Sequence, residues 1–454
     1  MKVTIVGTGY VGLTTGVSLA YLGHKVTCLD VNQSKINLLK EKKSPIYEPH
    51  LEELMDLAWK NLNFTTRFEE AIPGSDVVFI AVGTPSLPDG NPDLSYVRSA
   101  AQAIGENLTD HYAVVINKST VPIGSGNWVD SIVRDAYKKR HGNEPNGRFA
   151  VASNPEFLRE GSALHDTFYA DRIVVGSDSS KALETLYSLY KPILEQTFSA
   201  PNFLSRPEGL GAVPFITTNL ASAELIKYAA NAFLALKISY INEIAQLAER
   251  VGADITQIAK GIGLDARIGT RFLQAGIGWG GSCFAKDTSA LVATAGEYGI
   301  SLPIVNSARE VNIQQRGRIV EKVLSELKIL KGRTIGLLGL AFKPHTDDLR
   351  DAPALDIAKM LIDRGAKVKA HDPIALEKAK KDASEIGLIL CSTPLEVAEE
   401  ADAVILVTEW PQYRELNWAQ IHKTMRNPFL LDGRNFLDQE QLVRTGFKYL
   451  GIGK

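Results

Sequence analysis

Short apolar runs alternate with helix-period segments through residues 1–212 of this 454-residue chain. The runs read KVTIVG, KVTCLD, DVVFIAV, AVVIN and FAVASN, and helical periods cover 94–107 and 128–139 between them. Strands that are apolar throughout and are separated by helices are typical of a parallel sheet covered on both faces. The alternation therefore predicts a parallel α/β domain over residues 1–212.

The rest of the chain divides into two further parts. Residues 215–250 read as one helix without an internal proline, and Gly252 follows as its C′ residue. Helical patterns continue to residue 330. Strand–helix alternation then returns with TIGLLGLAF, KVKAHDP, DAVILVTEW and FLLDGRN, around a helix over 355–364. We expect a central helical domain over 213–325 and a second α/β domain over 326–454.

Composition limits the partners and the compartment. A formal net charge of −2, with 45% hydrophobic and 22% charged residues, is typical of a globular protein and gives no electrostatic case for nucleic acid or an anionic membrane. No apolar run reaches the ~20 residues of a membrane span, and since the sequence reads directly into a strand we expect no signal peptide. Cys28, Cys283 and Cys391 are too widely spaced for a disulfide framework or a zinc site. We expect a cytoplasmic protein without a metal.

The turn GTGYVG follows the first apolar run, opens a helix and matches GxGxxG. Gly7, Gly9 and Gly12 allow a tight turn and a close backbone approach to a pyrophosphate at the positive end of a helix. Asp30 ends the second run about 20 residues on, where an acid binds a ribose diol and repels a 2′-phosphate. The pattern predicts NAD rather than NADP, with a ligand-free glycine turn as the alternative. The expected fold class is α/β, with two Rossmann-like parallel-sheet domains joined by a long central helix.

Polar loops follow the later strands of the first domain. Thr84 follows the fourth strand, Ser119 and Thr120 follow the fifth, and Glu156 and Glu160 follow the sixth. Taken singly, each is more typical of a cap or a turn, but together they line the edge where an open parallel sheet binds its ligands. The two glutamates, four residues apart, either share a helix face or form solvated surface.

The long helix carries a second group of polar residues. Glu224, Lys227 and Asn231 are spaced three and four residues apart, so they share one face within apolar surroundings. Lys227 either extends its ammonium to water or is desolvated and more easily deprotonated. The second state suits a general base or a group that stabilises an oxyanion.

The segment GIGWGGSCFAKD surrounds Cys283 with glycines, which let a backbone and a ligand approach closely. Ser282 is a candidate N-cap for a helix over 285–297, which places Cys283 at a helix N-terminus near Lys286, where the thiolate is favoured. Asp287 is placed to bind a water or an amine. This pattern favours a nucleophilic cysteine, and an inert thiol in a structural loop is the alternative. Cys28 and Cys391 lie in apolar strands and read as small buried hydrophobes.

Over essentially its whole length the chain resembles the UDP-glucose 6-dehydrogenase family, one of the nucleotide-sugar 6-dehydrogenases. The resemblance rests on GTGYVGL, VGTPS, KSTVP, SNPEFLREG, ELIKYAANAFLA, RIGTRFL, GGSCFAKD, GLAFKPHTDDLRDAP and DGRN, in this order. Trp279 stands where phenylalanine or tyrosine is usual, and Ala285 stands where proline is common. The resemblance implies a four-electron, NAD-dependent oxidation of UDP-glucose to UDP-glucuronate, and a helical dimerisation region in the centre of the chain.

The same resemblance implies a role for each matching residue. Cys283 matches the cysteine that captures the aldehyde as a thiohemiacetal and then forms a thioester. Lys227 matches the lysine that takes the hydroxyl proton or stabilises an oxyanion, with Asn231 as its partner. Asp287, Thr120 and Glu156 match residues that bind or activate water. The implied cofactor contacts are Gly7, Gly9, Tyr10, Val11, Gly12, Asp30, Lys35, Thr84, Thr120, Glu160, Lys286 and Arg350. The implied substrate contacts are Glu156, Phe157, Leu158, Arg159, Glu160, Lys227, Asn231, Arg267, Phe272, Gly280, Lys343 and Arg434. Arg267 matches an arginine that can come from a neighbouring subunit, so a homodimer or a larger homo-oligomer is expected.

Several alternatives stay open at this point. A two-electron hydroxy-acid dehydrogenase shares the Rossmann domain and the Lys-x-x-x-Asn pair, but it needs neither GGSCFAKD nor a second α/β domain. An NAD-binding regulatory scaffold would need no reactive cysteine. GDP-mannose and N-acetylated UDP-hexoses are alternative substrates, although Phe284 is more typical of the UDP-glucose members. The pattern Gly336-x-x-Gly339 reads as a partial phosphate loop, and with Lys343 and Arg434 it predicts that the C-terminal domain holds UDP.

Overall fold

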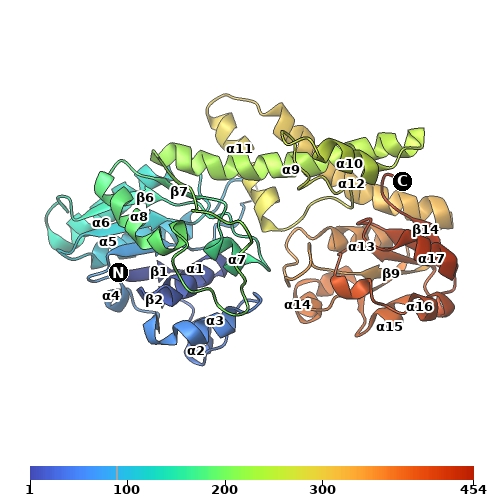
Figure 1. Ribbon diagram of the computed structural model, residues 1–454, viewed down its shortest axis with the longest axis horizontal. Coiled ribbons are helices and arrows are strands. Elements are labelled where there is room, and N and C mark those ends of the chain that lie inside the picture. The colour runs from blue at the N-terminus through green and yellow to red at the C-terminus, as the bar shows by residue number, and fades with distance from the viewer. Residues whose placement is uncertain (88–89) are drawn as a thin grey trace. The chain divides into compact units, whose positions relative to one another are not determined.

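The computed structural model describes residues 1–87 and 90–454, which divide into two compact units (Figure 1). The first unit contains Met1–Ala229 and Ser289–Glu297, and the second contains Ala230–Thr288 and Tyr298–Lys454. Each unit is built around one sheet.

The described residues of the first unit form an eight-stranded sheet in the order β3-β2-β1-β4-β5-β6-β7-β8. The strands are β1 (Lys2–Val6), β2 (Lys25–Leu29), β3 (Leu62–Thr65), β4 (Val77–Ile80), β5 (Ala113–Asn117), β6 (Phe149–Ser153), β7 (Ile173–Gly176) and β8 (Phe215–Thr218). Neighbouring strands are parallel except β6 and β7, which meet in an antiparallel pairing of Ser153 with Gly176. The predicted parallel α/β domain is confirmed, with one antiparallel step that the sequence pattern did not indicate.

Helices cover both faces of this sheet. In β4, Val77 and Phe79 pack into one hydrophobic core and Val78 and Ile80 into another, because successive residues of a strand point to opposite faces. The first core is formed with α1 (Tyr10–Tyr21), α2 (Gln33–Lys40), α3 (Leu51–Ala58), α7 (Ala163–Phe168) and α8 (Ser180–Leu194). The second is formed with α4 (Phe68–Ala71), α5 (Ser95–Asn107) and α6 (Ser125–His141), and α5 and α6 lie side by side (Figure 1).

The second unit repeats the same plan with a six-stranded parallel sheet in the order β11-β10-β9-β12-β13-β14. The strands are β9 (Thr334–Leu338), β10 (Lys367–His371), β11 (Ile389–Leu390), β12 (Ala403–Leu406), β13 (Phe429–Asp432) and β14 (Lys448–Leu450). One face packs on α12 (Pro303–Leu327), α13 (Pro353–Asp363) and α14 (Leu376–Asp382). The other face packs on α15 (Pro394–Ala398), α16 (Trp418–Thr424) and α17 (Gln439–Thr445). The unit also contains α10 (Ile255–Gly263).

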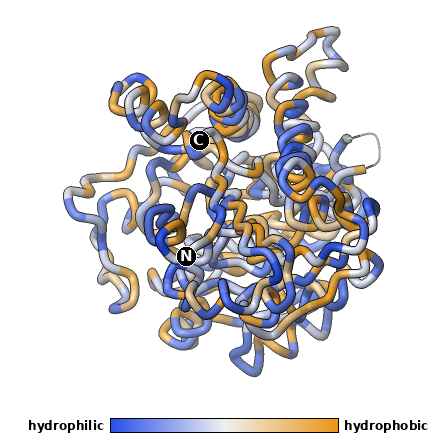
Figure 2. The backbone as a smooth tube through the Cα atoms, turned by 90° about the vertical axis from the view of Figure 1, so that its right-hand side faces the viewer, coloured by the Kyte–Doolittle hydropathy of each residue, from blue (hydrophilic) through white to orange (hydrophobic). Residues whose placement is uncertain are grey.

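The long helix α9 spans Leu220–Val251, five residues later at its start than predicted. Residues 215–218 (FITT) form strand β8 instead, because their β-branched side chains suit an edge strand paired with β7. The Asn219 side chain then accepts the Ser222 N–H at 2.8 Å and caps the helix. Gly252 follows the helix at φ +74°, as predicted for a C′ residue. Along the helices the backbone alternates between hydrophobic and hydrophilic residues (Figure 2), which is typical of helices that bury one face.

Gly339 of the second unit occupies the position that Gly7 holds in the first. Both glycines follow the first strand of their sheet, with φ of +103° at Gly7 and +101° at Gly339. Each donates its N–H to the last residue of the next strand along the chain: Gly7 to Leu29 O at 2.7 Å and Gly339 to His371 O at 2.8 Å. Gly336, in contrast, lies inside β9, where an added Cβ would come within 2.6 Å of Val397 Cγ1. The predicted partial phosphate loop is therefore wrong for Gly336, which is a packing glycine of the strand.

Asp372 holds the corresponding turn of the second unit together. It is fully buried, and its Oδ2 accepts the N–H groups of Leu340 and Ala341 and the indole N–H of Trp410 at 2.8–3.1 Å. Its Oδ1 accepts the N–H groups of Ile374 and Ala375 at 3.0 and 2.9 Å. The carboxylate therefore organises the turn with five donors from the chain itself.

Replacing Asp372 with asparagine should lower the free energy of unfolding by about 3 kcal/mol, since one acceptor oxygen becomes a donor among buried N–H groups. Urea unfolding of the full chain measures this. The exposed Asp363, changed to asparagine at the end of α13, is the control and should shift stability by less than about 0.5 kcal/mol. Equal stability of the Asp372 variant and the wild type would contradict the role assigned to the carboxylate.

Candidate active site

The glycine-rich turn between β1 and α1 is shaped for a ligand. An added Cβ on Gly7 would meet Ala81 O at 2.6 Å, and one on Gly12 would meet Gly7 O at 2.0 Å, so packing requires both glycines. A Cβ on Gly9 would have no protein atom within 4 Å, so packing does not require a glycine there. The open space at Gly9, at the start of α1, fits the close approach of a pyrophosphate. Tyr10 and Val11 are the first residues of that helix.

Asp30 follows β2 beside this turn. Its Oδ2 accepts the N–H and the hydroxyl of Thr8 at 2.9 and 2.8 Å and lies 3.5 Å from Lys35 Nζ. Its Oδ1 accepts the Asn32 N–H at 2.9 Å. Burial alone would raise the pKa of Asp30, but the hydrogen bonds from Asn32 and Thr8 and the Lys35 charge together lower it. The group is therefore an ionised acceptor with remaining lone pairs, as binding a ribose diol requires.

The loops after β4 and β5 are tied to each other. The Thr84 hydroxyl donates to Thr120 O at 2.9 Å, and the Ser119 hydroxyl donates to Val82 O at 2.8 Å. The loops after β4 and β5 are therefore connected at the carboxyl edge of the sheet.

Lys227 and Glu156 form a buried ion pair. The Lys227 ammonium donates to Glu156 O at 2.6 Å and to Glu156 Oε1 at 3.0 Å, and the two side chains are 5% and 7% exposed. Burial alone would raise the pKa of Glu156, but the Lys227 charge and the Leu158 N–H lower it below its ordinary value. Lys227 is therefore buried in an ion pair and does not extend its ammonium to water.

The loop after β6 carries the remaining predicted residues of this edge. Residues 154–159 adopt no helix, so the suggestion that Glu156 and Glu160 share a helix face is wrong. The Phe157 ring lies between two cations, with Arg172 at 4.0 Å and Lys227 Nζ at 5.5 Å from its centroid. Arg159 is exposed and pairs with Asp166.

Lys118 is a second buried lysine next to this ion pair, and sequence reasoning assigned it no role. It is 8% exposed, and its ammonium donates to Asn154 Oδ1 at 3.1 Å, an atom that also accepts the Tyr190 hydroxyl at 2.6 Å. Burial is the main reason that the pKa of Lys118 falls to about 8. The Glu156 charge opposes this shift and the Lys227 charge adds to it. A lysine directly after a buried strand, in NKST, was the available signal.

Glu224 shares a helix face with Lys227, but its carboxylate holds neighbouring elements of the first unit together. Its carboxylate accepts the N–H groups of Gly124 and Gly126 at 2.7 and 2.8 Å and the Ser153 hydroxyl at 3.0 Å. These donors lie at the start of α6 and at the end of β6, and burial raises the pKa of Glu224. Glu224 therefore caps α6 and fixes α9 to the sheet.

In the second unit, Cys283 lies in the first turn of α11 (Ser282–Glu297) and is exposed. The prediction of a helix N-terminus is confirmed, although Ser282 is the first helical residue rather than the cap. Such a position favours the thiolate form of a cysteine. Cys28 and Cys391 are buried, and burial raises the pKa of each, to about 12 for Cys28, so both are poor nucleophiles, as predicted.

Asp287 lies one helical turn after Cys283 and is 1% exposed. Its Oδ2 accepts the Asn231 amide at 2.6 Å, and its Oδ1 accepts the Lys286 ammonium at 2.8 Å. The second unit thus brings together three predicted site residues, Asn231, Lys286 and Asp287, within reach of the helix turn that carries the thiol.

Protein packing requires the glycines before Cys283, and whether a ligand approaches them stays a prediction. An added Cβ on Gly276 would lie 2.7 Å from Gly433 O, and one on Gly278 would lie 2.5 Å from Asn312 Oδ1. An added Cβ on Gly280 would lie 2.4 Å from Asp351 O. A Cβ on Gly281 would meet the Phe342 ring at 2.7 Å. The Asn312 side chain holds the loop through the N–H and the carbonyl of Trp279 at 2.7 and 2.9 Å. The glycines therefore shape the approach to α11.

The remaining predicted residues lie on loops of the second unit. Arg434, after β13, donates to Val407 O at 2.7 Å and lies 3.2 Å from a Glu409 carboxylate oxygen. Lys343 lies over the Phe342 ring at 5.3 Å, and Arg350 pairs with Asp348. Arg267 pairs with Asp265 and is 88% exposed, and the Phe272 ring contacts Phe284 edge-on.

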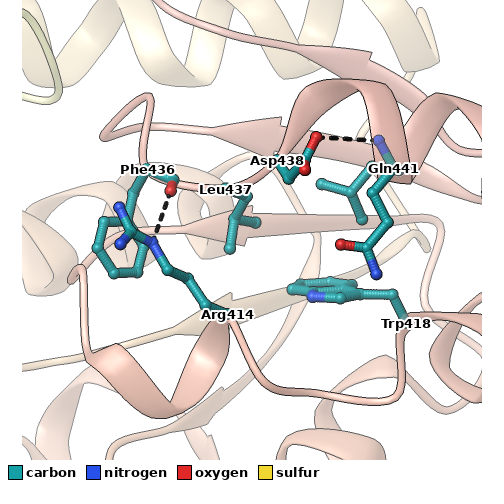
Figure 3. Close-up of a pocket in the computed structure, with 7 residues that line it drawn as sticks. Arg414, Trp418, Phe436, Leu437, Asp438 and Gln441 are labelled. Atoms are coloured by element: carbon teal, nitrogen blue, oxygen red, sulfur yellow. Dashed lines mark hydrogen bonds between the residues drawn. The ribbon is translucent and has the colours of Figure 1, made fainter.

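A cavity of about 320 Å³ beside α16 and α17 lies apart from these residues (Figure 3). Its polar side chains are used internally: Arg414 donates to Phe436 O at 3.0 Å, and Asp438 accepts the Gln441 N–H at 3.0 Å. None of the residues that line the cavity is a predicted site residue, so the cavity does not belong to the candidate site.

Three models of one family match the chain in order. They are the NAD binding domain over residues 1–194, the central domain over 221–314 and the UDP binding domain over 336–439. The chain belongs to the UDP-glucose/GDP-mannose dehydrogenase family. As a member of this family it is an NAD-dependent oxidoreductase, and the turn from Gly7 to Gly12 lies within the NAD binding domain.

Relatives of this family match the full length. The chain is 47% identical over 455 residues to UDP-glucose 6-dehydrogenase TuaD of Bacillus subtilis, covering 100% of this chain and 93% of the relative. It is 44% identical over 460 residues to UDP-glucose 6-dehydrogenase of Rhizobium meliloti, covering 100% of both. The solved structure of a UDP-glucose dehydrogenase from Pyrobaculum islandicum matches with a TM-score of 0.87 and 38% identity over 99% of this chain and 97% of that one. Over residues 1–87 and 90–454, no helix is long and apolar enough to cross a bilayer.

Replacing Lys118 with methionine should raise the free energy of unfolding of this protein at pH 7 by about 2 kcal/mol. The pKa of Lys118 is lowered from 10.5 to about 8, which means that burial disfavours its charged form. Below pH 8 the lysine is charged in both states and the full cost is present. Between pH 8 and 10.5 the folded lysine loses its proton first, so the wild type gains stability and the advantage of the variant shrinks.

Urea unfolding at pH 7 and at pH 9.5 measures this difference. The control is Lys139→Met, on the exposed surface of α6, which should show no pH-dependent difference from the wild type. A Lys118→Met variant that is less stable than the wild type at pH 7 would contradict the prediction.

Proposed function

We propose that this enzyme oxidises UDP-glucose to UDP-glucuronate in two successive oxidations. The observation that carries the proposal is the exposed Cys283 thiol in the first turn of α11, one turn before the buried Asp287. The full-length relatives named UDP-glucose 6-dehydrogenase support the choice of substrate. A thiol at this point distinguishes a four-electron oxidation from a two-electron one.

Lys227 acts in the first oxidation. As a neutral amine it would accept the proton of the C6 hydroxyl, or as an ammonium it would stabilise negative charge on the oxygen, and Glu156 holds the side chain in place. Bound at the glycine turn, NAD would supply the hydride acceptor for carbon 6 in each oxidation. The product of this first step is the aldehyde.

Cys283 makes the second oxidation possible. Its thiolate attacks the aldehyde carbon, the C–S bond forms, and the π electrons move to oxygen, which restores a C–H hydride donor. Loss of the second hydride from this oxyanion leaves a thioester. Water, bound by Asp287 with Thr120 and Glu156, breaks the C–S bond and releases the acid and the thiol. The overall balance is UDP-glucose, two NAD⁺ and one water to UDP-glucuronate, two NADH and three protons.

The remaining roles follow the family pattern. Asp30 and the glycine turn bind NAD, and Lys343 and Arg434 bind the UDP part in the C-terminal domain. The division into domains over 1–212, 213–325 and 326–454, and a cytoplasmic location, belong to the same proposal.

Cys283→Ala and Cys283→Ser should each lower turnover by about 10³-fold, a barrier increase of about 4 kcal/mol, while NADH binding stays unchanged. Serine is scarcely ionised at neutral pH, so it does not restore the nucleophile. The wild type should form two NADH per sugar consumed, without free aldehyde, and should prefer UDP-glucose over GDP-mannose and UDP-N-acetylhexosamines. NADH absorbance and mass spectrometry of the sugar product measure these quantities.

Two results would reject the cysteine mechanism. One is turnover of Cys283→Ala within about tenfold of the wild type, far from the loss expected without a nucleophile. The other is a wild type that yields one NADH per sugar and releases an aldehyde. Oxidation of another sugar nucleotide with two NADH would keep the mechanism and change only the substrate.

We further propose a homodimer formed through the solvent-facing side of α9. Phe233, Tyr240, Leu247 and Val251 are 60%, 48%, 59% and 66% exposed. Their spacing of seven, seven and four residues places them on one side of the helix, where solvent-exposed helices carry polar residues. A second copy of the chain would cover this apolar stripe. Such an assembly also gives the exposed Arg267 access to a neighbouring subunit, as the family pattern implies.

Changing both Tyr240 and Leu247 to aspartate should convert the dimer to a monomer, because paired stripes would place four carboxylates in one apolar interface. Light scattering after size-exclusion chromatography measures the mass. The matched control is Tyr96→Asp on α5, where the tyrosine is 56% exposed outside the stripe and the mass should stay dimeric. A dimeric double variant, or a monomeric wild type, would reject this interface.

A further inference from the structure

A buried carboxylate outside the predicted site, Glu48, binds two segments distant in sequence. It lies before α3 and is 7% exposed. Its Oε1 accepts the Ala163 N–H at 2.6 Å, and its Oε2 accepts the Gly161 N–H at 2.7 Å. The Tyr10 hydroxyl donates a short hydrogen bond to the same Oε2. Glu48 therefore contacts the first residue of α1 and the end of the loop after β6.

Tyr10 completes this arrangement. Its hydroxyl oxygen accepts the Gly161 N–H at 2.7 Å, so that N–H is shared between the tyrosine and Glu48. Burial and the Glu48 charge raise the pKa of Tyr10 well above its ordinary value, so the hydroxyl keeps its proton and remains a donor. Burial likewise raises the pKa of Glu48, although the hydrogen bonds from Tyr10, Gly161 and Ala163 counteract it.

The segments joined in this way carry the two proposed binding functions of the unit. Tyr10 belongs to the glycine turn of the cofactor, and residues 155–161 carry Glu156 and Glu160 without a helix or a strand to fix them. We propose that Glu48 is a positioning residue that fastens the loop 155–161 to the cofactor turn. The inference deepens the proposed function, because it rests on the roles assigned there to the glycine turn and Glu156.

Loss of this contact should weaken ligand binding, because the loop 155–161 would be less ordered before the ligands arrive. A loop that is fixed before the ligands arrive costs no further conformational entropy when they bind, whereas a released loop has to be ordered at that moment. Glutamine at position 48 keeps the shape but turns one acceptor oxygen into a donor that faces the Gly161 N–H. The variant should therefore weaken binding more than its small change in volume suggests.

Glu48→Gln should raise the Kd for NADH, measured by fluorescence titration, by about tenfold, the worth of one hydrogen bond to a charged group. The KM for UDP-glucose should rise as well, with a kcat reduced by less than about fivefold, because no reacting atom is touched. The matched control is Glu52→Gln, whose carboxylate accepts the Ser44 N–H at 2.8 Å near the same segment. Its NADH Kd should stay within about twofold of the wild type, as expected for an exposed contact.

Tyr10→Phe provides an independent and milder variant, which also decides the matter if Glu48→Gln does not fold. It should raise the NADH Kd by about fivefold, and the double variant should be no more than about twofold worse than the poorer single one, since both changes release one contact. Multiplying effects in the double variant, or an unchanged Kd in Glu48→Gln or Tyr10→Phe, would overturn the proposal. NADH binding is measured without a sugar, so a failed oxidation of UDP-glucose leaves this outcome unaffected.

Discussion

The rest of the first unit has to offset the free-energy cost of burying the charges of Lys227 and Glu156. Taking a charge out of water costs several kcal/mol, and a buried ion pair recovers this only with good geometry and further hydrogen bonds. Two contacts from Lys227 and the Leu158 N–H supply them, and the second lysine, Lys118, adds a further charge that must be held by Asn154. The hydrophobic cores on the two faces of the sheet supply the stability that offsets the cost of burying these charges.

The two sheets share one strand order over six strands and use one position of it in different ways. Asp30 and Asp372 both follow the second strand of their sheet, but Asp372 is surrounded by five N–H donors of the chain, whereas Asp30 retains lone pairs towards the open glycine turn. The first arrangement makes a rigid turn, and the second leaves hydrogen-bond acceptor capacity on the Asp30 carboxylate. The common plan thus carries a fully used aspartate in one unit and a partly used one in the other.

Local patterns predicted the features that depend on local chemistry. Apolar runs gave the central strands, GxGxxG gave the turn at Gly7, and the position of Cys283 at the start of a helix followed from its neighbours. The failures have a common cause in contacts between distant residues. The segment 215–218 is a strand because β7 lies beside it, and Gly336 is a glycine because Val397 packs against it. Lys118 and Glu48 gained their roles from partners 36 and 115 positions away, which no sequence window contains.

Tight packing of the glycine loop before Cys283 limits which substitutions the loop can accept. Gly276, Gly278, Gly280 and Gly281 each face a protein atom at 2.7 Å or less from an added Cβ, so even alanine would displace the backbone that leads into α11. In a saturation mutagenesis screen, these four positions should tolerate few substitutions, because any side chain would meet a protein atom. The map of intolerant positions would therefore follow the glycine loop that leads into α11, whatever the role of the thiol.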